Sequence, residues 1–161
     1  MLRKGDEYRD SIRDGREVWV DGERVKDVPT HPVFKPIVDI RARIYDMAHE
    51  KKFSQQLTYV DEISGEINCI GSKLPKTKND WITKREAIKT ILYEVGAVVT
   101  RVGDETAGEM WSLYDGTNIL NEVDPRFGKN IANHIQKVLE SDTFHVSGNT
   151  DPKGDRSKLP Q

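Results

Sequence analysis

An arginine lies where a long apolar stretch ends, in the segment VVTRVGDETAG. Arg101 follows the apolar residues, and Gly103 then breaks the pattern before Asp104. We predict that a new helix begins at Asp104, so that a fixed cation and the free backbone N–H groups of a helix N-terminus converge here. Both features attract anions. The segment is a candidate anion site, with an ordinary turn as the alternative.

A second segment of this kind is NTDPKGDRS, near the end of the sequence. Gly154 permits a tight turn, and Lys153 and Arg156 flank it. Successive backbone N–H groups in such a turn can hold a phosphate, with basic side chains assisting. Here too an ordinary turn is the alternative.

The histidines and the cysteine do not indicate a metal site. Only one cysteine is present, so an internal disulfide and a CxxC metal motif are both excluded. We expect Cys69 to be a small buried apolar residue. No two histidines have metal-ligand spacing, and we expect His134 to pack in or beside the core. The four histidines are His31, His49, His134 and His145.

The composition narrows the class of protein. The chain has 161 residues, with 25 Lys and Arg interspersed among 27 Asp and Glu. This pattern argues against a nucleic-acid surface, which needs a concentrated basic face. No apolar run approaches the roughly 20 residues of a membrane span. The N-terminus MLRKGDEYRD lacks an apolar segment of signal-peptide type, so we expect no membrane association and a cytoplasmic location.

The first half of the chain predicts two helices and a hairpin. A short helix is expected over residues 6–13, and Asp21 with Gly22 fits a type I′ turn between short strands. A longer helix should follow Thr30, because apolar residues recur at helical spacing. That apolar stripe consists of Val33, Ile37, Ile40, Ile44 and Met47.

The second half predicts a hairpin and three helices. Ser64 and Gly65 would form the tip of the hairpin, and Thr77 with Asp80 fits a capping box that opens a long helix. Further helices are expected over residues 104–114 and 125–140. Gly96 is placed within the long helix, where a close backbone approach would explain it. The buried face of that helix is predicted to contain Ile88, Ile91, Leu92, Val95, Val98 and Val99.

Four segments resemble a known family. They are GDEYRDSIRDGREVWVDGERVKDVPTHPVFKP, LPKTKNDWITKREA, TRVGDE and TDPKGDRS. They are similar to the flavoprotein family of the 4-hydroxyphenylacetate 3-monooxygenase oxygenase component and 4-hydroxybutyryl-CoA dehydratase. The resemblance implies a mainly α fold, the helical N-terminal domain of an acyl-CoA-dehydrogenase-like enzyme with one or two small β-hairpins. Residues 1–148 would form this domain, and residues 149–161 would begin the linker into a missing flavin-binding β domain.

The resemblance also implies an activity. The chain would be the N-terminal portion of a reduced-flavin-dependent phenol hydroxylase, inactive by itself. A separate NAD(P)H-flavin reductase would supply FADH2, and one oxygen atom would be added ortho to the hydroxyl of a phenolic substrate. The full-length protein would be a homo-oligomer, a dimer or a tetramer. The alternative is a stand-alone helical interaction module that has the fold without the chemistry.

The substrate-binding residues follow from the same resemblance. Arg101 matches the arginine that faces the aromatic substrate. Glu105 stands where the phenylacetate hydroxylases have a tyrosine, and Ser147 stands where they have a histidine. His145 lies two residues earlier and is the candidate replacement. These differences imply a phenol other than 4-hydroxyphenylacetate.

The flavin contacts are assigned to the last segment. The resemblance gives this role to Thr150, Lys153, Gly154, Asp155 and Arg156. The dehydratase members hold an iron–sulfur cluster with cysteines of the helical region, and Cys69 lies outside that region. We therefore expect no metal centre in this chain.

Overall fold

The structure is a computed structural model that describes residues 2–97 and 104–143. Its α-helices are α1 (Gly5–Ser11), α2 (Lys35–Met47), α3 (Ser54–Leu57), α4 (Lys78–Glu94), α5 (Asp104–Asp115), α6 (Thr117–Val123) and α7 (Arg126–Ser141). Two antiparallel hairpins pair β1 (Trp19–Val20) with β2 (Glu23–Arg24), and β3 (Thr58–Val60) with β4 (Ile67–Cys69). Two 3₁₀ turns, η1 (Val28–Thr30) and η2 (Ile70–Ser72), complete the described elements. The mainly helical fold with small hairpins is confirmed.

The β1–β2 hairpin has the turn that its sequence predicts. Asp21 and Gly22 both have positive φ, 51° and 84°. Positive φ at both central residues defines the type I′ turn, whose twist matches that of the two strands. The second hairpin likewise places Ser64 and Gly65 between its strands, as predicted.

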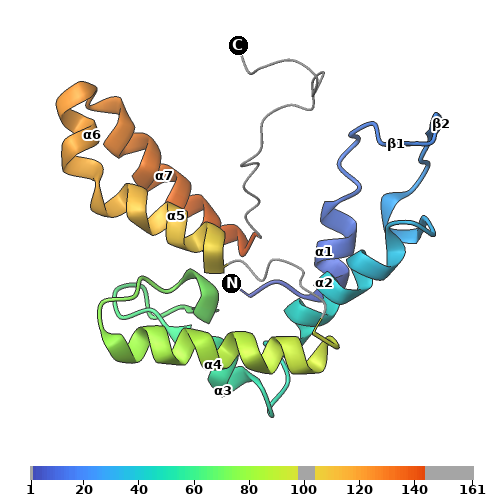
Figure 1. Ribbon diagram of the computed structural model, residues 1–161, viewed down its shortest axis with the longest axis horizontal. Coiled ribbons are helices and arrows are strands. Elements are labelled where there is room, and N and C mark those ends of the chain that lie inside the picture. Colours follow the sequence, from blue (N-terminus) through green and yellow to red (C-terminus); the bar gives the residue numbers. More distant parts are fainter. Residues whose placement is uncertain (1, 98–103, 144–161) are drawn as a thin grey trace, which may run out of the picture.

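Helix α2 packs on two sides, which the predicted single stripe does not capture. Ile44 and Met47 are buried in the main core, whereas Ala42 and Tyr45 are buried against α1. The start of the stripe is wrong: Val33 precedes the helix and is 60% exposed. The predicted stripe explains the contact of α2 with the main core. It does not explain the contact of α2 with α1, which packs beside it (Figure 1).

Helix α4 begins as predicted and ends earlier than predicted. The Thr77 hydroxyl accepts from the Asp80 N–H at 3.2 Å, and the Asp80 carboxylate accepts from the Thr77 N–H at 2.8 Å. At the other end Gly96 has φ 72°, and the Ala97 N–H donates to the Leu92 carbonyl at 2.6 Å. This is the glycine-terminated helix end of the Schellman type. Gly96 therefore ends the helix, and among the described residues no atom lies within 4 Å of a Cβ built on it, so a close approach does not explain it.

Two clusters of buried side chains organise the described part. The first joins α2, α3, η2 and α4, and consists of Ile44, Met47, Leu57, Ile70, Ala87 and Ile91. The second joins α5 and α7, and consists of Met110, Ile135 and Val138. Of the predicted buried face of α4, Ile91 is buried and Val95 packs against the first cluster. Val98 and Val99 lie outside the described residues.

Helices α5, α6 and α7 lie together to one side of the rest of the molecule (Figure 1). Helix α6 is absent from the sequence-based prediction. Gly128 lets α7 pack closely on α6, because a Cβ at this position would lie 2.5 Å from Asn121 Oδ1. Its N–H donates to the same oxygen at 2.9 Å. The prediction that His134 packs in or beside the core is wrong, since it lies on the exposed side of α7. Within the described part, no helix is both long and apolar enough to cross a membrane.

Candidate functional site

Most of the residues with predicted site roles lie outside the described part. These are Arg101, His145, Ser147, Thr150, Lys153, Gly154, Asp155 and Arg156. Glu105 lies in the first turn of α5, where the structure describes the backbone only. The prediction of a helix over residues 104–114 is confirmed, since α5 covers Asp104–Asp115. The structure therefore describes α4 and α5, the helices on either side of Arg101.

A polar cluster anchors the chain just before the predicted flavin-contacting segment. Asp142 ends α7 in the left-handed conformation, with φ 45°. Its carboxylate accepts from the Arg3 N–H at 2.9 Å, and its carbonyl accepts from the Tyr45 hydroxyl at 2.8 Å. Burial raises the pKa of the Asp142 carboxyl, an effect that the Arg3 N–H and guanidinium partly oppose.

The same cluster includes the N-terminal segment and the end of α2. The His49 ring nitrogen Nε2 lies 3.0 Å from the Arg3 carbonyl, and the Arg3 guanidinium lies 5.8 Å from the centre of the Tyr45 ring. Sequence reasoning missed this cluster. Its hydrogen-bonded pairs are 46 to 139 residues apart in the chain, so no local pattern brings them together. These contacts hold Asp142, at the end of α7, against Tyr45 of α2 and Arg3 of the N-terminal segment.

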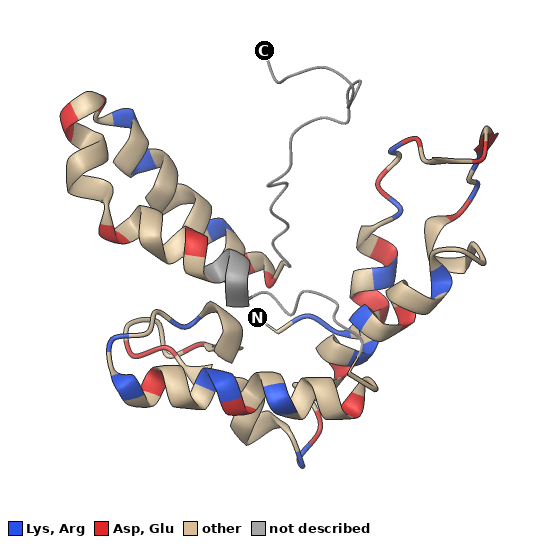
Figure 2. Ribbon diagram, in the orientation of Figure 1, with Lys and Arg blue, Asp and Glu red and all other residues tan. Residues whose placement is uncertain are grey.

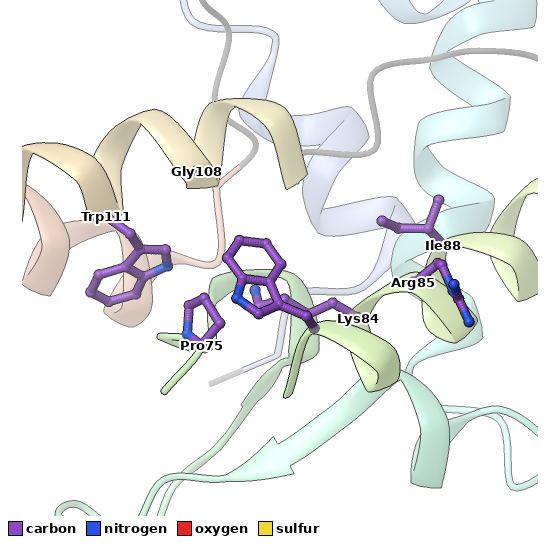
Figure 3. A pocket seen from close by; sticks show the side chains of 7 residues that line it. Pro75, Lys84, Arg85, Ile88, Gly108 and Trp111 are labelled. Atoms are coloured by element: carbon purple, nitrogen blue, oxygen red, sulfur yellow. The ribbon is translucent and has the colours of Figure 1, made fainter. Parts of the chain in front are cut away.

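A pocket of about 120 Å³ lies between α4 and α5 (Figure 3). Its lining residues are Pro75, Trp81, Lys84, Arg85, Ile88, Gly108 and Trp111. In Figure 3 Trp111 lies at one side of the pocket and Ile88 at the other, and the nitrogen edge of the Trp111 indole is turned toward the other lining residues. Sequence reasoning missed the pocket, because Trp81 and Trp111 come from different helices.

The polar groups of this pocket differ in how they are paired. Lys84 is only 5% exposed, and its ammonium donates to the Gly71 carbonyl at 2.7 Å. Trp111 packs edge-on against Tyr114, with ring centres 5.8 Å apart. The Trp111 indole nitrogen is buried and has no hydrogen-bond partner among the residues that the structure describes. A buried donor without an acceptor is uncommon, because its desolvation is uncompensated.

Charge and thiol chemistry give no second site in the described part. Both signs of charge occur along α2 and along α4 (Figure 2). Burial raises the pKa of the Cys69 thiol to about 11, so the thiol is uncharged at neutral pH. Among the described residues, no group of three or more His, Cys, Asp or Glu is placed to hold a metal ion.

Comparison with known proteins identifies the family. Residues 4–161 match the family described as 4-hydroxyphenylacetate 3-hydroxylase N terminal. The chain therefore belongs to this family, and its fold is the helical N-terminal part of an acyl-CoA-dehydrogenase-like architecture.

Two relatives and one solved structure show the extent of the similarity. The 4-hydroxyphenylacetate 3-monooxygenase oxygenase component of Thermus thermophilus is 27% identical over 99% of this chain and 32% of its own length. The FADH(2)-dependent monooxygenase TftD of Burkholderia cepacia is 29% identical, over 97% of this chain and 31% of its own. The structure of a 4-hydroxyphenylacetate 3-monooxygenase oxygenase component with FAD and 4-hydroxyphenylacetate superposes with a TM-score of 0.84 at 27% identity, over 98% of this chain and 32% of that one. The chain thus spans about a third of the length of these relatives.

Proposed function

We propose that this chain is the N-terminal part of a reduced-flavin-dependent phenol hydroxylase, the oxygenase component of a two-component monooxygenase. The observation that carries the proposal is the family match over residues 4–161, the same span over which the chain is similar to monooxygenases. The similar enzymes bear the names of different phenols, among them 4-nitrophenol and 2,4,6-trichlorophenol. The substrate class is therefore a phenol.

Arg101 is the proposed substrate-binding residue. It lies in the segment that joins α4 to α5, after the helix end at Gly96 and before Asp104, the first described residue of α5. A guanidinium stays charged at any working pH and binds a planar anion through two parallel N–H groups. Such a contact favours the phenolate over the phenol and orients the ring. In this assignment Glu105, His145 and Ser147 take the positions beside the substrate.

FAD is the proposed cofactor, and the pocket between α4 and α5 is too small to hold it. Pockets for ligands of this kind occupy roughly 300–1,000 Å³. The pocket between α4 and α5 has only about 120 Å³. The proposed flavin contacts are Thr150 and residues 153–156, which follow the anchored Asp142. The remaining surface of the flavin site would come from the two thirds of the protein beyond the length of this chain.

The cofactor and the protein would contribute different parts of the chemistry. Reduced FAD would supply the activation of O2, which protein side chains cannot perform. This chain would bind the phenol, favour its ionised form and help to exclude water. We further propose that a separate NAD(P)H-flavin reductase supplies the FADH2, and that the enzyme is a cytoplasmic homo-oligomer, a dimer or a tetramer.

The test compares the 161-residue chain with the full-length protein. Each is supplied with reduced FAD, O2 and one phenol from a panel of 4-hydroxyphenylacetate, 4-nitrophenol and 2,4,6-trichlorophenol. We expect the full-length protein to form a hydroxylated product from at least one phenol and the isolated chain to form none. A full-length protein that neither binds reduced FAD nor converts any phenol would leave the helical interaction module as the better description.

A further inference from the structure

Three aspartate–glycine pairs occur in the chain, Asp14–Gly15, Asp21–Gly22 and Asp115–Gly116. In such a pair the glycine nitrogen can attack the carbon of the preceding side-chain carboxyl and close a five-membered ring. Glycine favours this reaction because it has no side chain to hinder the approach or to restrict the backbone. The structure places the three pairs in different surroundings, so their reactivity should differ.

Ring closure has three structural requirements. The glycine N–H must be free of a hydrogen bond, because its nitrogen is the nucleophile. The carboxyl must be protonated part of the time, because the departing oxygen leaves as water. The backbone must also be free to rotate, so that the nitrogen can reach the carboxyl carbon.

The pair Asp115–Gly116 fails the first and the third requirement. Asp115 is the last residue of α5, and the Gly116 N–H donates to the Ser112 carbonyl at 3.0 Å. This bond continues the hydrogen-bond pattern of the helix. Helix α6 begins at the next residue, Thr117, so the backbone of the pair is held between two helices.

The pair Asp14–Gly15 fails the second requirement. Arg16 Nε lies 2.8 Å from Asp14 Oδ1 and 2.9 Å from Oδ2, and a second guanidinium nitrogen also donates to Oδ2. The Arg16 backbone N–H donates to Oδ1 at 3.2 Å. These hydrogen bonds from Arg16 lower the pKa of the Asp14 carboxyl to about 2. The protonated form that would react is therefore scarce at neutral and mildly acidic pH.

The pair Asp21–Gly22 meets the first two requirements. Both residues are exposed at the tip of the β1–β2 hairpin. Within the described part of the chain, the Asp21 carboxylate makes no hydrogen bond or ion pair, and the Gly22 N–H donates no hydrogen bond. Apart from its chain neighbours, no described atom lies within 4 Å of a Cβ built on Gly22, so water reaches the pair.

The hairpin also gives this pair the freedom to rotate. Strands β1 and β2 contain two residues each, and a lone two-stranded hairpin is only marginally stable, so its turn opens readily. Asp21 has φ 51°, a region that is unfavourable for a residue with a Cβ, so its own preference is to leave the turn. In Figure 1 the hairpin lies at one extremity of the molecule, away from α5, α6 and α7.

We propose that Asp21 is a site of spontaneous isoaspartate formation. The Gly22 nitrogen forms a bond to Asp21 Cγ and loses its proton, and one carboxyl oxygen leaves as water, which gives a succinimide ring. Water then adds to either carbonyl of the ring. Addition at the main-chain carbonyl breaks its bond to the Gly22 nitrogen, so that the chain continues through the side-chain carbon as isoaspartate. Addition at the other carbonyl restores aspartate, and no reactant other than water is needed.

The modification changes the turn that joins β1 to β2. Isoaspartate adds one carbon to the backbone between Asp21 Cα and the Gly22 nitrogen. A type I′ turn needs two central residues of ordinary backbone length at positive φ, so the modified loop no longer matches the twist of the strands. The inference is independent of the proposed function, because the reaction needs only the folded chain and water.

The first experiment ages the folded full-length protein in mildly acidic buffer and locates isoaspartate by mass spectrometry with electron-transfer fragmentation. Digestion after glutamate separates the three pairs into peptides of residues 8–17, 18–23 and 110–122. Because a pKa lowered by more than one unit reduces the protonated fraction about tenfold or more, isoaspartate should form at Asp21 at least about tenfold faster than at Asp14. It should also form faster at Asp21 than at Asp115.

The same protein aged in denaturant is the reference, and there the three pairs should react at similar rates. In the folded protein, equal rates at the three pairs, or a faster reaction at Asp14 or Asp115, overturn the proposal. It is also overturned if the denatured protein forms isoaspartate at Asp21 and the folded protein forms none there.

Two variants test the reasons for the selectivity. Arg16→Gln removes the guanidinium that holds Asp14, so isoaspartate at Asp14 should increase about tenfold while the rate at Asp21 stays the same. Asp21→Asn keeps a pair that favours the type I′ turn and replaces the carboxyl by an amide that needs no protonation. Isoaspartate should then form faster in the peptide of residues 18–23. An unchanged rate at Asp14 in the first variant, or no faster reaction in the second, contradicts the proposal.

Discussion

Gly5 is the position where a single methyl group should be most informative about the fold. It is the first residue of α1, and its N–H donates to the Asp46 carboxylate at 2.8 Å. A Cβ at this position would lie 2.6 Å from Asp46 Oδ2 and 2.7 Å from the Ala42 carbonyl oxygen. The Asp46 side chain can rotate away, but the Ala42 carbonyl belongs to the backbone of α2. Gly5→Ala must therefore push α1 away from α2.

The magnitude follows from two opposing effects. Overpacking of this kind costs about 1–3 kcal/mol. Alanine is the better helix former by about 0.5–1 kcal/mol, which offsets part of that cost. These ranges leave a net loss between about 0 and 2.5 kcal/mol, and the contact with backbone favours the upper half. We therefore expect a net loss of about 1–2 kcal/mol, or a Tm lower by roughly 2–8 °C for a chain of this size.

Gly108→Ala is the matched control for this substitution. Gly108 lies in α5, and a Cβ there would meet no atom of the described residues within 4 Å. The same change should therefore raise the stability by about 0.5–1 kcal/mol through helix propensity alone. Urea unfolding followed by circular dichroism measures both variants. If Gly5→Ala is as stable as the parent while Gly108→Ala is stabilised, the close α1–α2 contact is wrong.

Three further predictions concern the site and its supports. In the full-length protein, Arg101→Ala should remove a charge-assisted contact of roughly 1.5–3 kcal/mol and lower kcat/KM by about 10- to 150-fold. Arg101→Lys should recover little of this loss, and steady-state kinetics measures both variants. Tyr45→Phe should lower the free energy of unfolding by about 1 kcal/mol in urea titrations, because it removes the hydrogen bond to the Asp142 carbonyl. The pKa of Asp80 is held low, first by Lys73 and then by Thr77, so the stabilisation it provides is present above its unfolded pKa and is lost as the pH falls. Asp80→Asn should therefore lose less Tm than the parent between pH 7 and pH 3, and an equal loss would contradict this.

Local chemistry explains which parts of the fold the sequence could predict. The type I′ turn at Asp21 and Gly22 and the capping box of Thr77 and Asp80 depend on neighbouring residues, and both predictions are confirmed. Gly96 was misplaced because a glycine near the end of an apolar pattern fits both a helix interior and a helix end. Its φ of 72° settles the matter in favour of the end.

Contacts between distant segments explain the rest. Helix α6 has only 7 residues and no buried one. Its apolar residues Ile119, Leu120 and Val123 are too few to establish a helical period. The Asp142 anchor depends on contacts with segments about a hundred residues away. The pocket depends on how α5 lies against α4, which no local pattern specifies. The assignments of Arg101, of Thr150 and of residues 153–156 remain predictions.

Substitutions can distinguish residues that stabilise the fold from residues that bind the substrate. Both segments with predicted site residues adjoin described elements. The segment of Arg101 joins α4 to α5, and the segment of Thr150 and residues 153–156 follows Asp142 in the sequence. Tyr45→Phe should lower the free energy of unfolding, because it removes the hydrogen bond from Tyr45 to the Asp142 carbonyl. Arg101→Ala should act on kcat/KM and leave Tm unchanged if its guanidinium binds the phenolate. A lower Tm with unchanged turnover per folded molecule would instead make Arg101 a helix-terminal cation that supports the fold.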